Sequence, residues 1–390
     1  MRRLFIVGTQ GIPAAYGGLE TFADQLATRL VARGHPVWVT CEVMPSTERE
    51  RPEAYRGVQL VYVEAPDNNL RTIVADRKAL ARCAQLARPG DVVYLLGYGV
   101  GPFADRTIRK MRRAGVEFWL NPDGLEWKRP RWPWWVQRYF RFCERHLLHR
   151  SDRVICDAAA IRDHHGREYG VPAERMDVIE YGAPLVEQVQ DPELVARRDA
   201  YLARYGLEPG EYYCYVGRFV PDNNLELMVR GVLDPSVRRR LLVFAAHDED
   251  DPFYRKIRGL IDASDDPDKV VLTGGVYDPP LLQALRLSQF AYFHGHEVGG
   301  TNPALVEAMG LGSFILALST PFNREVLRDA ALYFEKDVAS FVEALRRAEA
   351  LSAEEAAELQ ERARGRVRDH YNWERITDEY ERLLGAAPRS

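Results

Sequence analysis

Residues 290–312 read FAYFHGHEVGGTNPALVEAMGLG, which is a predicted strand, turn and helix in succession. The run FAYFHG (290–295) is aromatic and apolar, as is typical of a strand buried on both faces of a sheet. Asn302 is a favoured helix N-cap and Pro303 suits the first helical position, so a helix is predicted from there to Gly312. A buried strand followed directly by a helix is the repeating unit of α/β folds.

The same alternation runs along the whole chain in two sets. The first set of apolar runs covers 4–9, 37–43, 58–65, 92–98, 117–122, 153–158 and 177–182, and the second covers 212–218, 241–246, 270–275, 290–295 and 314–319. Amphipathic stretches between the runs predict helices. The 390 residues suit about two domains, so we predict α/β domains at 1–188 and 189–366 and a final helical segment at 367–390. Two doubly wound domains are expected to bind ligands in a cleft outside the carboxyl ends of their strands.

Composition excludes several classes of protein. The net charge is −4, which gives no general reason to expect a nucleic-acid partner. The five cysteines include no C-x-x-C pair, which argues against a disulfide framework or a zinc site and favours a cytoplasmic location. No apolar run approaches the ~18 residues of a membrane span, and MRRLFIVGTQG at the N-terminus is interpreted as a strand rather than a signal peptide.

The turn at 299–302 has the features of an anion site. Gly299 and Gly300 lie just before the predicted helix, where free backbone N–H groups and the helix dipole attract negative charge. Thr301 and Asn302 add side-chain donors. Glu307 lies more than one turn inside the helix, where a carboxylate suits sugar hydroxyls, such as those of a ribose, better than a pyrophosphate. The alternative is a tight turn followed by a solvated glutamate.

Two further stretches favour the same chemistry. YVGRFVPDNN (215–224) is a strand that ends at Arg218, whose guanidinium suits bidentate phosphate pairing. Gly17 and Gly18 precede another predicted helix, which makes a second turn able to accept an anion. A structural ion pair for Arg218 and a flexible connection at Gly17 remain as alternatives. The chain has no G-x-G-x-x-G dinucleotide fingerprint after its first strand.

Together these motifs resemble the family 4 retaining glycosyltransferases, which have the GT-B architecture of two facing Rossmann-like domains. The similar segments are YGGLETFADQLATRLVARGHPV, YVGRFVPDNN, GGTNPALVEAMGLG and the closing YNWERITDEYERLL, which in that family crosses back to the first domain. GTQGIPAAYGGLETF and NPDGLEWKR further resemble the bacterial rhamnosyltransferases of capsule and exopolysaccharide assembly. The resemblance implies transfer of a sugar, with dTDP-L-rhamnose as the best donor candidate, to an undecaprenyl-diphosphate-linked saccharide, without a metal or cofactor.

The chain departs from the family pattern at three positions. Gly299 replaces the first of two glutamates, and Glu297 lies two residues further from Glu307. Asn223 replaces a phosphate-binding lysine, so Arg218 and the amides of 299–302 must stabilise more of the leaving-group charge. Asp123 stands where the family often has histidine.

A carboxylate at Asp123 suits an acceptor hydroxyl, with Glu126 as the neighbouring alternative and capping of the turn as the structural one. His294, at the end of the strand before the glycine turn, is a candidate to face the donor, and a plain loop role is the alternative for both His294 and His296.

A basic aromatic segment follows at 126–150. It includes Lys128, Arg129, Arg131, Trp132, Trp134 and Trp135, a combination that suits the headgroup zone of an anionic bilayer. We therefore expect a peripheral protein on the inner face of the cell membrane that meets a lipid-linked acceptor there. A buried helix with one basic face and nucleic-acid stacking are the alternatives.

Other functions remain open at this point. The acidic stretch HDEDD (247–251) would suit a metal-dependent transferase, although acidic turns are usually solvated. Glu42 is placed to hold the ribose of a nicotinamide cofactor in an oxidoreductase. A GT-B epimerase, a transferase that uses a UDP or GDP sugar, and a non-catalytic sugar-nucleotide-binding protein are further possibilities.

Overall fold

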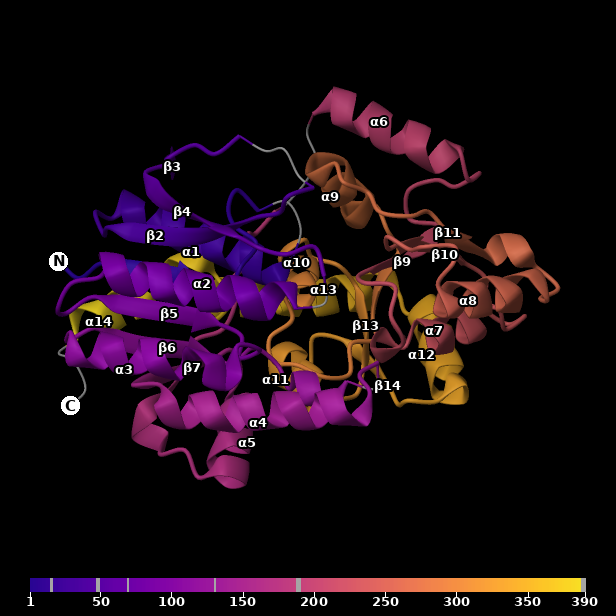
Figure 1. Cartoon of the computed structure of the whole chain (residues 1–390). Helices are drawn as coiled ribbons and strands as arrows, with labels where there is room; N and C mark the ends of the chain where they lie inside the picture. The colour runs from indigo at the N-terminus through magenta and orange to yellow at the C-terminus, as the bar shows by residue number, and fades with distance from the viewer. Residues whose placement is uncertain (15–16, 47–49, 69, 130, 187–190, 387–390) are drawn as a thin grey trace. The chain divides into compact units, whose positions relative to one another are not determined.

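The computed structural model describes the chain except residues 15–16, 47–49, 69, 130, 187–190 and 387–390 (Figure 1). It divides into two compact units, unit 1 being Met1–Tyr181 with Trp373–Ser390 and unit 2 being Gly182–Asn372. The division therefore lies a few residues from the predicted boundaries at 188 and 366. It falls at Tyr181 because this ring still packs in the core of unit 1, against Phe22 at 5.1 Å between ring centroids.

Unit 1 contains one eight-stranded sheet in the order β3-β4-β2-β1-β5-β6-β7-β8, in which only the β3–β4 pair is antiparallel. The strands are β1 (Leu4–Val7), β2 (Val37–Val43), β3 (Ala54–Tyr55), β4 (Val58–Glu64), β5 (Val92–Leu96), β6 (Glu117–Asn121), β7 (Arg153–Cys156) and β8 (Met176–Val178). Strands β1, β5, β6 and β7 are buried along their whole length, as the continuous apolar runs predicted.

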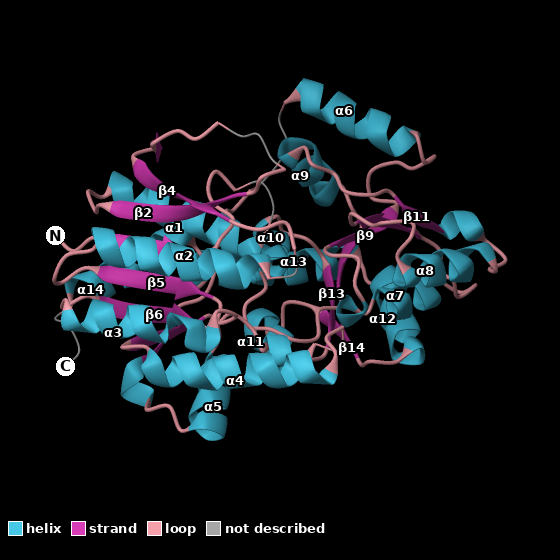
Figure 2. Cartoon of the chain, in the orientation of Figure 1, coloured by secondary structure: helices cyan, strands magenta, loops and turns pink. Residues whose placement is uncertain are grey.

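Helices cover both faces of this sheet (Figure 2). They are α1 (Gly18–Ala32), α2 (Arg71–Leu86), α3 (Asp105–Arg113), α4 (Trp134–Arg150), α5 (Ala159–Tyr169) and α14 (Trp373–Gly385), with short 3-10 turns η1 (Gly101–Ala104), η2 (Glu126–Lys128) and η3 (Ala173–Arg175). Phe22, Leu26 and Leu30 form the predicted apolar stripe of α1 and are buried against the sheet.

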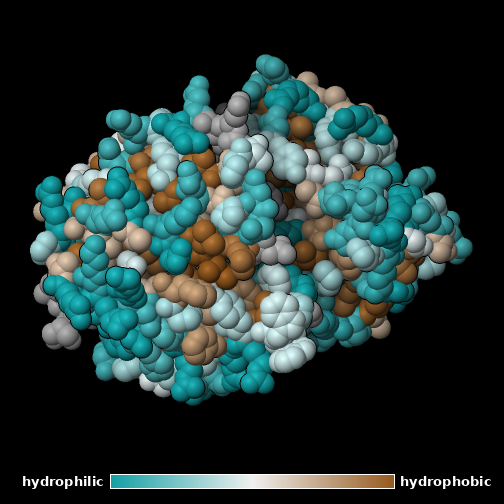
Figure 3. Space-filling model, in the orientation of Figure 1, coloured by the Kyte–Doolittle hydropathy of each residue, from teal (hydrophilic) through white to brown (hydrophobic). Residues whose placement is uncertain are grey.

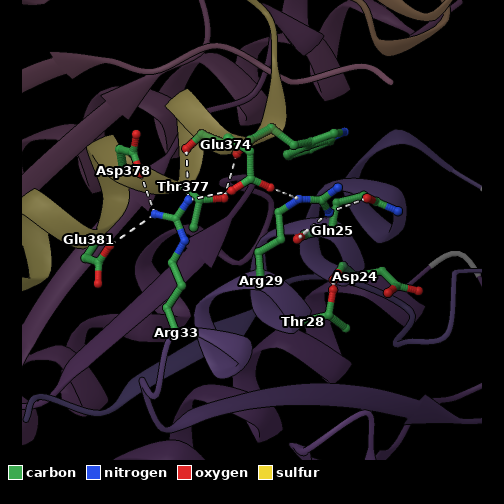
Figure 4. Close-up of polar contacts among 10 residues, drawn as sticks. Asp24, Gln25, Thr28, Arg29, Arg33, Glu374, Thr377, Asp378 and Glu381 are labelled. Atoms are coloured by element: carbon green, nitrogen blue, oxygen red, sulfur yellow. Dashed lines mark hydrogen bonds and ion pairs between the residues drawn. The ribbon is translucent and has the colours of Figure 1, made fainter. Parts of the chain in front are cut away.

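The C-terminal helix α14 belongs to unit 1 and packs beside α1. Phe22 lies within 5.8 Å of Tyr380 and 6.3 Å of Trp373, measured between ring centroids. Figure 4 shows Arg33 of α1 pointing toward three acidic side chains of α14, with contacts of 2.6 Å to Glu374, 2.5 Å to Asp378 and 3.1 Å to Glu381. Aromatic packing and charge pairing thus attach the last helix to the first one.

Unit 2 has a six-stranded parallel sheet in the order β11-β10-β9-β12-β13-β14. Its strands are β9 (Tyr212–Val216), β10 (Arg240–Phe244), β11 (Val270–Leu272), β12 (Ala291–His294), β13 (Ile315–Leu318) and β14 (Leu332–Phe334). Counted along the chain this is the order 3-2-1-4-5-6, which defines the doubly wound nucleotide-binding fold.

Alternate residues of these strands supply two separate cores. Tyr213 and Tyr215 point to one face, with helices α7 (Leu225–Val232), α8 (Pro252–Asp262) and α12 (Val338–Ala350). Tyr212 and Cys214 point to the other face, with α6 (Pro192–Ala203), α9 (Pro279–Leu287), α10 (Pro303–Gly310), α11 (Pro321–Leu327) and α13 (Ala353–Asp369). The 3-10 turns η4 (Pro221–Asn223) and η5 (Pro267–Lys269) complete the unit.

Each predicted strand run overlaps a strand, but the sequence analysis missed two strands. They are the two-residue β3 and the three-residue β14, both too short to show a hydrophobic period. Within the described residues, no helix has the length and apolar character needed to cross a membrane.

Candidate functional site

The predicted donor residues of unit 2 gather where the order of its sheet reverses. Strands β9 and β12 are neighbours although they are not consecutive, and ligands of such sheets bind outside the carboxyl ends of the strands at this point. Gly217 and Arg218 follow β9 directly, and His294 is the last residue of β12. The topology therefore places the sequence motifs of both strands at one edge of the sheet.

The turn before α10 has the predicted geometry. The Asn302 side chain accepts hydrogen bonds from the backbone N–H groups of Ala304 at 3.0 Å and Leu305 at 3.4 Å, and Pro303 begins the helix. This confirms the predicted cap. Gly299 has φ +151°, and a Cβ there would lie 3.1 Å from the His296 ring, so the position favours glycine. Thr301, within the turn, is only 2% exposed.

Hydrogen bonds of the Asn223 side chain connect the loop that follows β9 with the loop that follows β12. Its amide nitrogen donates to the Tyr215 hydroxyl at 2.9 Å and to the Arg218 carbonyl at 3.0 Å. Its amide oxygen lies 2.9 Å from Nδ1 of His296. Both ends of this amide are thus engaged within the protein, so Asn223 positions the loops that carry Arg218 and the glycine turn.

His294 is neutral and almost fully buried. Burial lowers its pKa to about 3, and Nε2 has no hydrogen-bond partner among the described residues. Buried polar atoms usually have partners, so an unsatisfied nitrogen at the carboxyl end of β12 is notable. A neutral imidazole can supply a hydrogen bond to a ligand without carrying charge, which is compatible with the predicted donor contact.

Glu307 is held by an arginine that the sequence analysis missed. Arg286 of α9 donates from Nη1 to Glu307 Oε2 at 2.9 Å and from Nη2 to the Ala304 carbonyl at 2.9 Å. The Arg286 guanidinium also lies 5.5 Å from the centre of the Tyr292 ring. A buried charge needs such partners, but they are 21 residues apart in the chain, and no local pattern indicates the pair.

The other predicted groups of unit 2 differ in their surroundings. The side chain of Arg218 is exposed. A residue that binds a ligand arriving from solvent needs such exposure. Glu297, the neighbouring candidate carboxylate, accepts a hydrogen bond from Lys336 at 2.6 Å. In the acidic stretch 247–251, Asp251 caps α8 and Asp248 accepts from the N–H of Asp250. Across the described ranges, no three His, Cys, Asp or Glu side chains are grouped as metal ligands.

The glycine turn of unit 1 has an acidic side chain beside it. Gly17 has φ +111°, and Glu20 fills the adjacent space, because a Cβ on Gly17 would lie 2.0 Å from its carboxylate. Glu20 also accepts from the backbone N–H of Gln10 at 2.9 Å, and burial raises its pKa. The second anion-accepting turn predicted at Gly17 and Gly18 therefore has the Glu20 carboxyl group as its neighbour, and it stays a prediction.

Asp123 remains a candidate for contact with an acceptor. It follows β6 in a left-handed conformation, φ +55°, and its N–H donates to Asn121 Oδ1 at 2.7 Å. Non-glycine residues rarely adopt positive φ, and such strain occurs often at functional sites. Its side chain is partly exposed.

Glu126 is committed to an ion network. It pairs with Arg129 at 2.6 Å, receives a hydrogen bond from Trp132 Nε1 at 2.8 Å, and contacts Arg131. Burial alone would raise the pKa of Glu126, but these partners lower it below its ordinary value. A carboxylate held in this way is a poor general base, which weakens the alternative assignment of that role to Glu126.

The basic aromatic segment is divided between surface and interior. Trp134 and Trp135, at the start of α4, are 71% and 61% exposed, and Lys128 is also exposed. Arg131 and Trp132 are partly exposed. Arg129 is only 5% exposed, which corrects its assignment to a membrane-facing surface. It is buried because its guanidinium neutralises Glu126.

More apolar surface adjoins this segment. Tyr139 of α4 donates to the carbonyl of Gly99, two residues before η1, at 2.8 Å, and Phe103 of η1 is 54% exposed. Figure 3 shows hydrophobic surface over the part of unit 1 between α2 and α4.

Two further features of unit 1 bear on function. Glu42, at the end of β2, pairs with Arg71 at 2.6 Å, so it is not available to hold a ribose as an oxidoreductase would need. A pocket of about 850 Å³ lies outside the ends of β2 and β4, lined among others by Met44, Glu64 and Lys78. None of the predicted site residues lines it.

Comparisons with known sequences match parts of this chain. Residues 1–184 match a family described as "Domain of unknown function (DUF1972)". Alpha-D-kanosaminyltransferase of Streptomyces kanamyceticus is 29% identical over 134 residues, which are 34% of each chain. The matched part is therefore about a third of that relative's length.

Two solved structures resemble the whole chain. Sucrose-phosphate synthase from Thermosynechococcus elongatus aligns with a TM-score of 0.80 at 19% identity and covers 98% of both chains. HepE from Anabaena in complex with UDP and glucose aligns at 0.72 and 13% identity, covering 99% of this chain and all of the other. The fold is thus GT-B, with two Rossmann-like domains, as predicted.

Proposed function

We propose that the chain is a retaining glycosyltransferase that takes its sugar from a nucleoside-diphosphate sugar bound by unit 2. The observation that carries the proposal is the capped N-terminus of α10, which lies at the reversal point of the sheet with Glu307 one turn further in. The match to a kanosaminyltransferase and the UDP and glucose in the similar HepE structure support this class of reaction.

Each group in unit 2 has a role in this reaction. Backbone N–H groups of 299–302 and the Arg218 guanidinium would stabilise the charge that develops on the leaving diphosphate. His294 would add a neutral donor or acceptor near the sugar, because its Nε2 is unsatisfied within the described residues. Glu307 would accept a hydroxyl of the nucleoside sugar. The proposal includes no metal or cofactor.

For the finer specificity we propose L-rhamnose, supplied as dTDP-L-rhamnose, with UDP and GDP sugars as the alternatives. Support comes from the resemblance of NPDGLEWKR and the glycine turns to the capsule and exopolysaccharide rhamnosyltransferases. The proposed acceptor is a saccharide on a lipid diphosphate, whose attacking hydroxyl Asp123 would orient.

We also propose that unit 1 contacts an anionic membrane from its cytoplasmic side. Trp134, Trp135 and Phe103 expose large rings, and α4 also carries exposed Arg138 and Arg145, whereas its exposed Arg141 is paired with Glu168. Such rings enter the headgroup zone, and each cation near the surface contributes about 1 kcal/mol. A lipid-linked acceptor would be collected there.

A thermal-shift screen tests the donor proposal. UDP, GDP, dTDP and their sugar conjugates are added to the whole chain, and a ligand at a hundred times its Kd stabilises the fold by about 2.7 kcal/mol. At least one nucleoside diphosphate should raise Tm, and Glu307→Gln should reduce that shift. If none of them binds, or if NADH binds instead, the proposed function is wrong.

A further inference from the structure

Asp123 lies in a turn of unit 1 that is otherwise buried. The turn follows β6 and reads NPDGL (121–125), and the structure describes all five residues. Asn121, Pro122, Gly124 and Leu125 are buried, whereas Asp123 is partly exposed. The order of this sheet reverses between β1 and β5, and β6 is the next strand, so the turn adjoins the edge where such sheets bind ligands. Asp123 is therefore the residue through which this turn can meet a ligand from solvent.

The Asn121 side chain closes the turn from below. Its Oδ1 accepts a hydrogen bond from the backbone N–H of Asp123 at 2.7 Å, which is the bond of an Asx turn. The carbonyl oxygen of Asn121 accepts from the N–H of Gly97, in the loop after β5, at 2.8 Å. Asn121 is only 1% exposed. The amide oxygen that holds Asp123 thus projects from a fixed and buried backbone.

Asp123 needs this partner because its backbone is left-handed. Its φ is +55°, a conformation that residues with a Cβ adopt rarely and at a cost. The hydrogen bond to Asn121 favours the left-handed form over the extended and right-handed forms that would otherwise be preferred. Rotation into either of those forms would turn the side chain of Asp123 in another direction. The direction of the carboxylate therefore depends on Asn121.

The far end of the turn is held separately. The hydroxyl of Tyr98 accepts a hydrogen bond from the backbone N–H of Glu126 at 2.9 Å, and Tyr98 is 3% exposed. Burial raises the pKa of Tyr98 above its ordinary value, so this hydroxyl stays neutral. Leu125, one residue earlier, is 1% exposed. Because this end is anchored, a loss of the Asn121 bond would be felt chiefly at Asp123.

Stability alone does not account for an asparagine at position 121. Its Nδ2 is buried and has no hydrogen-bond partner among the described residues, and an unmet buried donor destabilises a fold. We propose that Asn121 is a positioning residue whose amide oxygen keeps Asp123 left-handed, so that the carboxylate faces the attacking hydroxyl of the acceptor. This rests on the proposed function. Asn121 acts only through Asp123 and contacts neither substrate.

Two small substitutions separate positioning from packing. Asn121→Ala and Asn121→Ser leave nearly the same space and both remove Nδ2, but only serine supplies an oxygen that can accept from the Asp123 N–H. The probes are dTDP-L-rhamnose and a synthetic saccharide on a lipid diphosphate. Asn121→Ala should lower kcat about tenfold or more at unchanged donor KM, since misplacing a reacting group is costly. Asn121→Ser should stay within about threefold of wild type. Equal losses in both variants would overturn the proposal.

A double-mutant cycle tests whether Asn121 acts through Asp123. In the Asp123→Asn background, Asn121→Ala should change kcat by less than about twofold, because the carboxylate that it orients is already absent. A further tenfold loss there would contradict the proposal. Ser151→Ala is the matched control, because Ser151 is fully buried in unit 1 and its hydroxyl donates to the Leu148 carbonyl at 3.1 Å. It should lower Tm and leave kcat unchanged.

Hydrogen exchange gives a readout that needs no substrate. Asn121→Ala should speed exchange about fivefold or more in peptides that cover 121–126, since one buried hydrogen bond is lost, and leave 293–302 of unit 2 as in wild type. Unchanged exchange at 121–126 would refute the role of Asn121. Should Asn121→Ala not fold, Asn121→Cys replaces it, because a thiol is a weak acceptor.

The two levels of the hypothesis fail differently. If the wild type transfers sugar from no nucleoside-diphosphate donor, the proposed function itself is wrong. If the wild type transfers sugar and Asn121→Ala does so at the same rate, only the role of Asn121 is wrong.

Discussion

Replacement of Asn223 by alanine should loosen the donor edge of unit 2 without any contact between Asn223 and the donor. The wild-type amide makes three hydrogen bonds, to the Tyr215 hydroxyl at 2.9 Å, the Arg218 carbonyl at 3.0 Å and the His296 ring at 2.9 Å. Each is worth about 1 kcal/mol net in a buried setting, so their loss should cost about 3 kcal/mol locally.

Hydrogen exchange with peptide resolution measures this effect. A loss of about 3 kcal/mol corresponds to roughly a hundredfold faster opening. Faster exchange should appear in both segments that Asn223 joins, 215–224 and 293–302, and affinity for nucleoside diphosphates should fall with it. All seven tryptophans lie in unit 1, so tryptophan emission should stay unchanged and report that unit 1 is intact.

Asn302→Ala is the matched control in the same site. It removes only the bonds to the N–H groups of Ala304 and Leu305, which costs about 1 kcal/mol. Faster exchange should then be confined to the first turn of α10. If Asn223→Ala weakens nucleotide binding while exchange at 293–302 stays as in wild type, Asn223 contacts the ligand directly and the reasoning is refuted.

Four other predictions follow from the geometry. Arg218→Ala should weaken nucleoside-diphosphate binding by about ten- to a hundredfold in calorimetry, since a charge-assisted contact is lost, and equal affinity would remove Arg218 from the site. Asp123→Asn should lower the transfer rate at least about tenfold with donor affinity retained; a shift in Tm with no loss of rate would indicate a structural role. Trp134→Ala combined with Trp135→Ala should reduce sedimentation with anionic vesicles by about tenfold or more, whereas unchanged binding would contradict membrane contact. Asp76 is buried and its pKa is raised well above 3.8, chiefly by burial, so above pH 3.8 the native state holds a proton that the unfolded state releases. The wild type should therefore lose about 1.4 kcal/mol of unfolding free energy per pH unit from this group as pH rises toward the native pKa, and Asp76→Asn should remove that dependence in urea titrations at pH 4 to 7.

Much of the fold was predictable because its signals are local. The runs that became β1, β5, β6 and β7 are apolar throughout, since a parallel sheet covered by helices buries both faces of a strand. The cap at Asn302 was equally local, because an N-cap bonds N–H groups two and three residues away. Strands β3 and β14 were missed because two or three residues are too few to show a hydrophobic period.

The candidate site was predictable only in part. The sequence identified the positions where a ligand meets strand ends and helix starts, such as Arg218 and the 299–302 turn. It assigned surface or catalytic roles to Arg129 and Glu126, which the structure instead pairs with each other at 2.6 Å. The sequence also predicted an anion-accepting turn at Gly17, and it gave no sign that the Glu20 carboxyl group occupies the space beside this residue.

By itself, the sequence determined the order of the strands and helices other than β3 and β14, the division into two α/β units and the types of side chain available at the edges of their sheets. These follow from hydrophobic period and backbone preference, which act over a few residues. The tertiary structure alone decided which charges are already neutralised, as where Arg286 holds Glu307 across 21 residues and Arg33 holds Glu374 across 341. An ion pair depends on proximity in space, and only the packed fold creates that proximity.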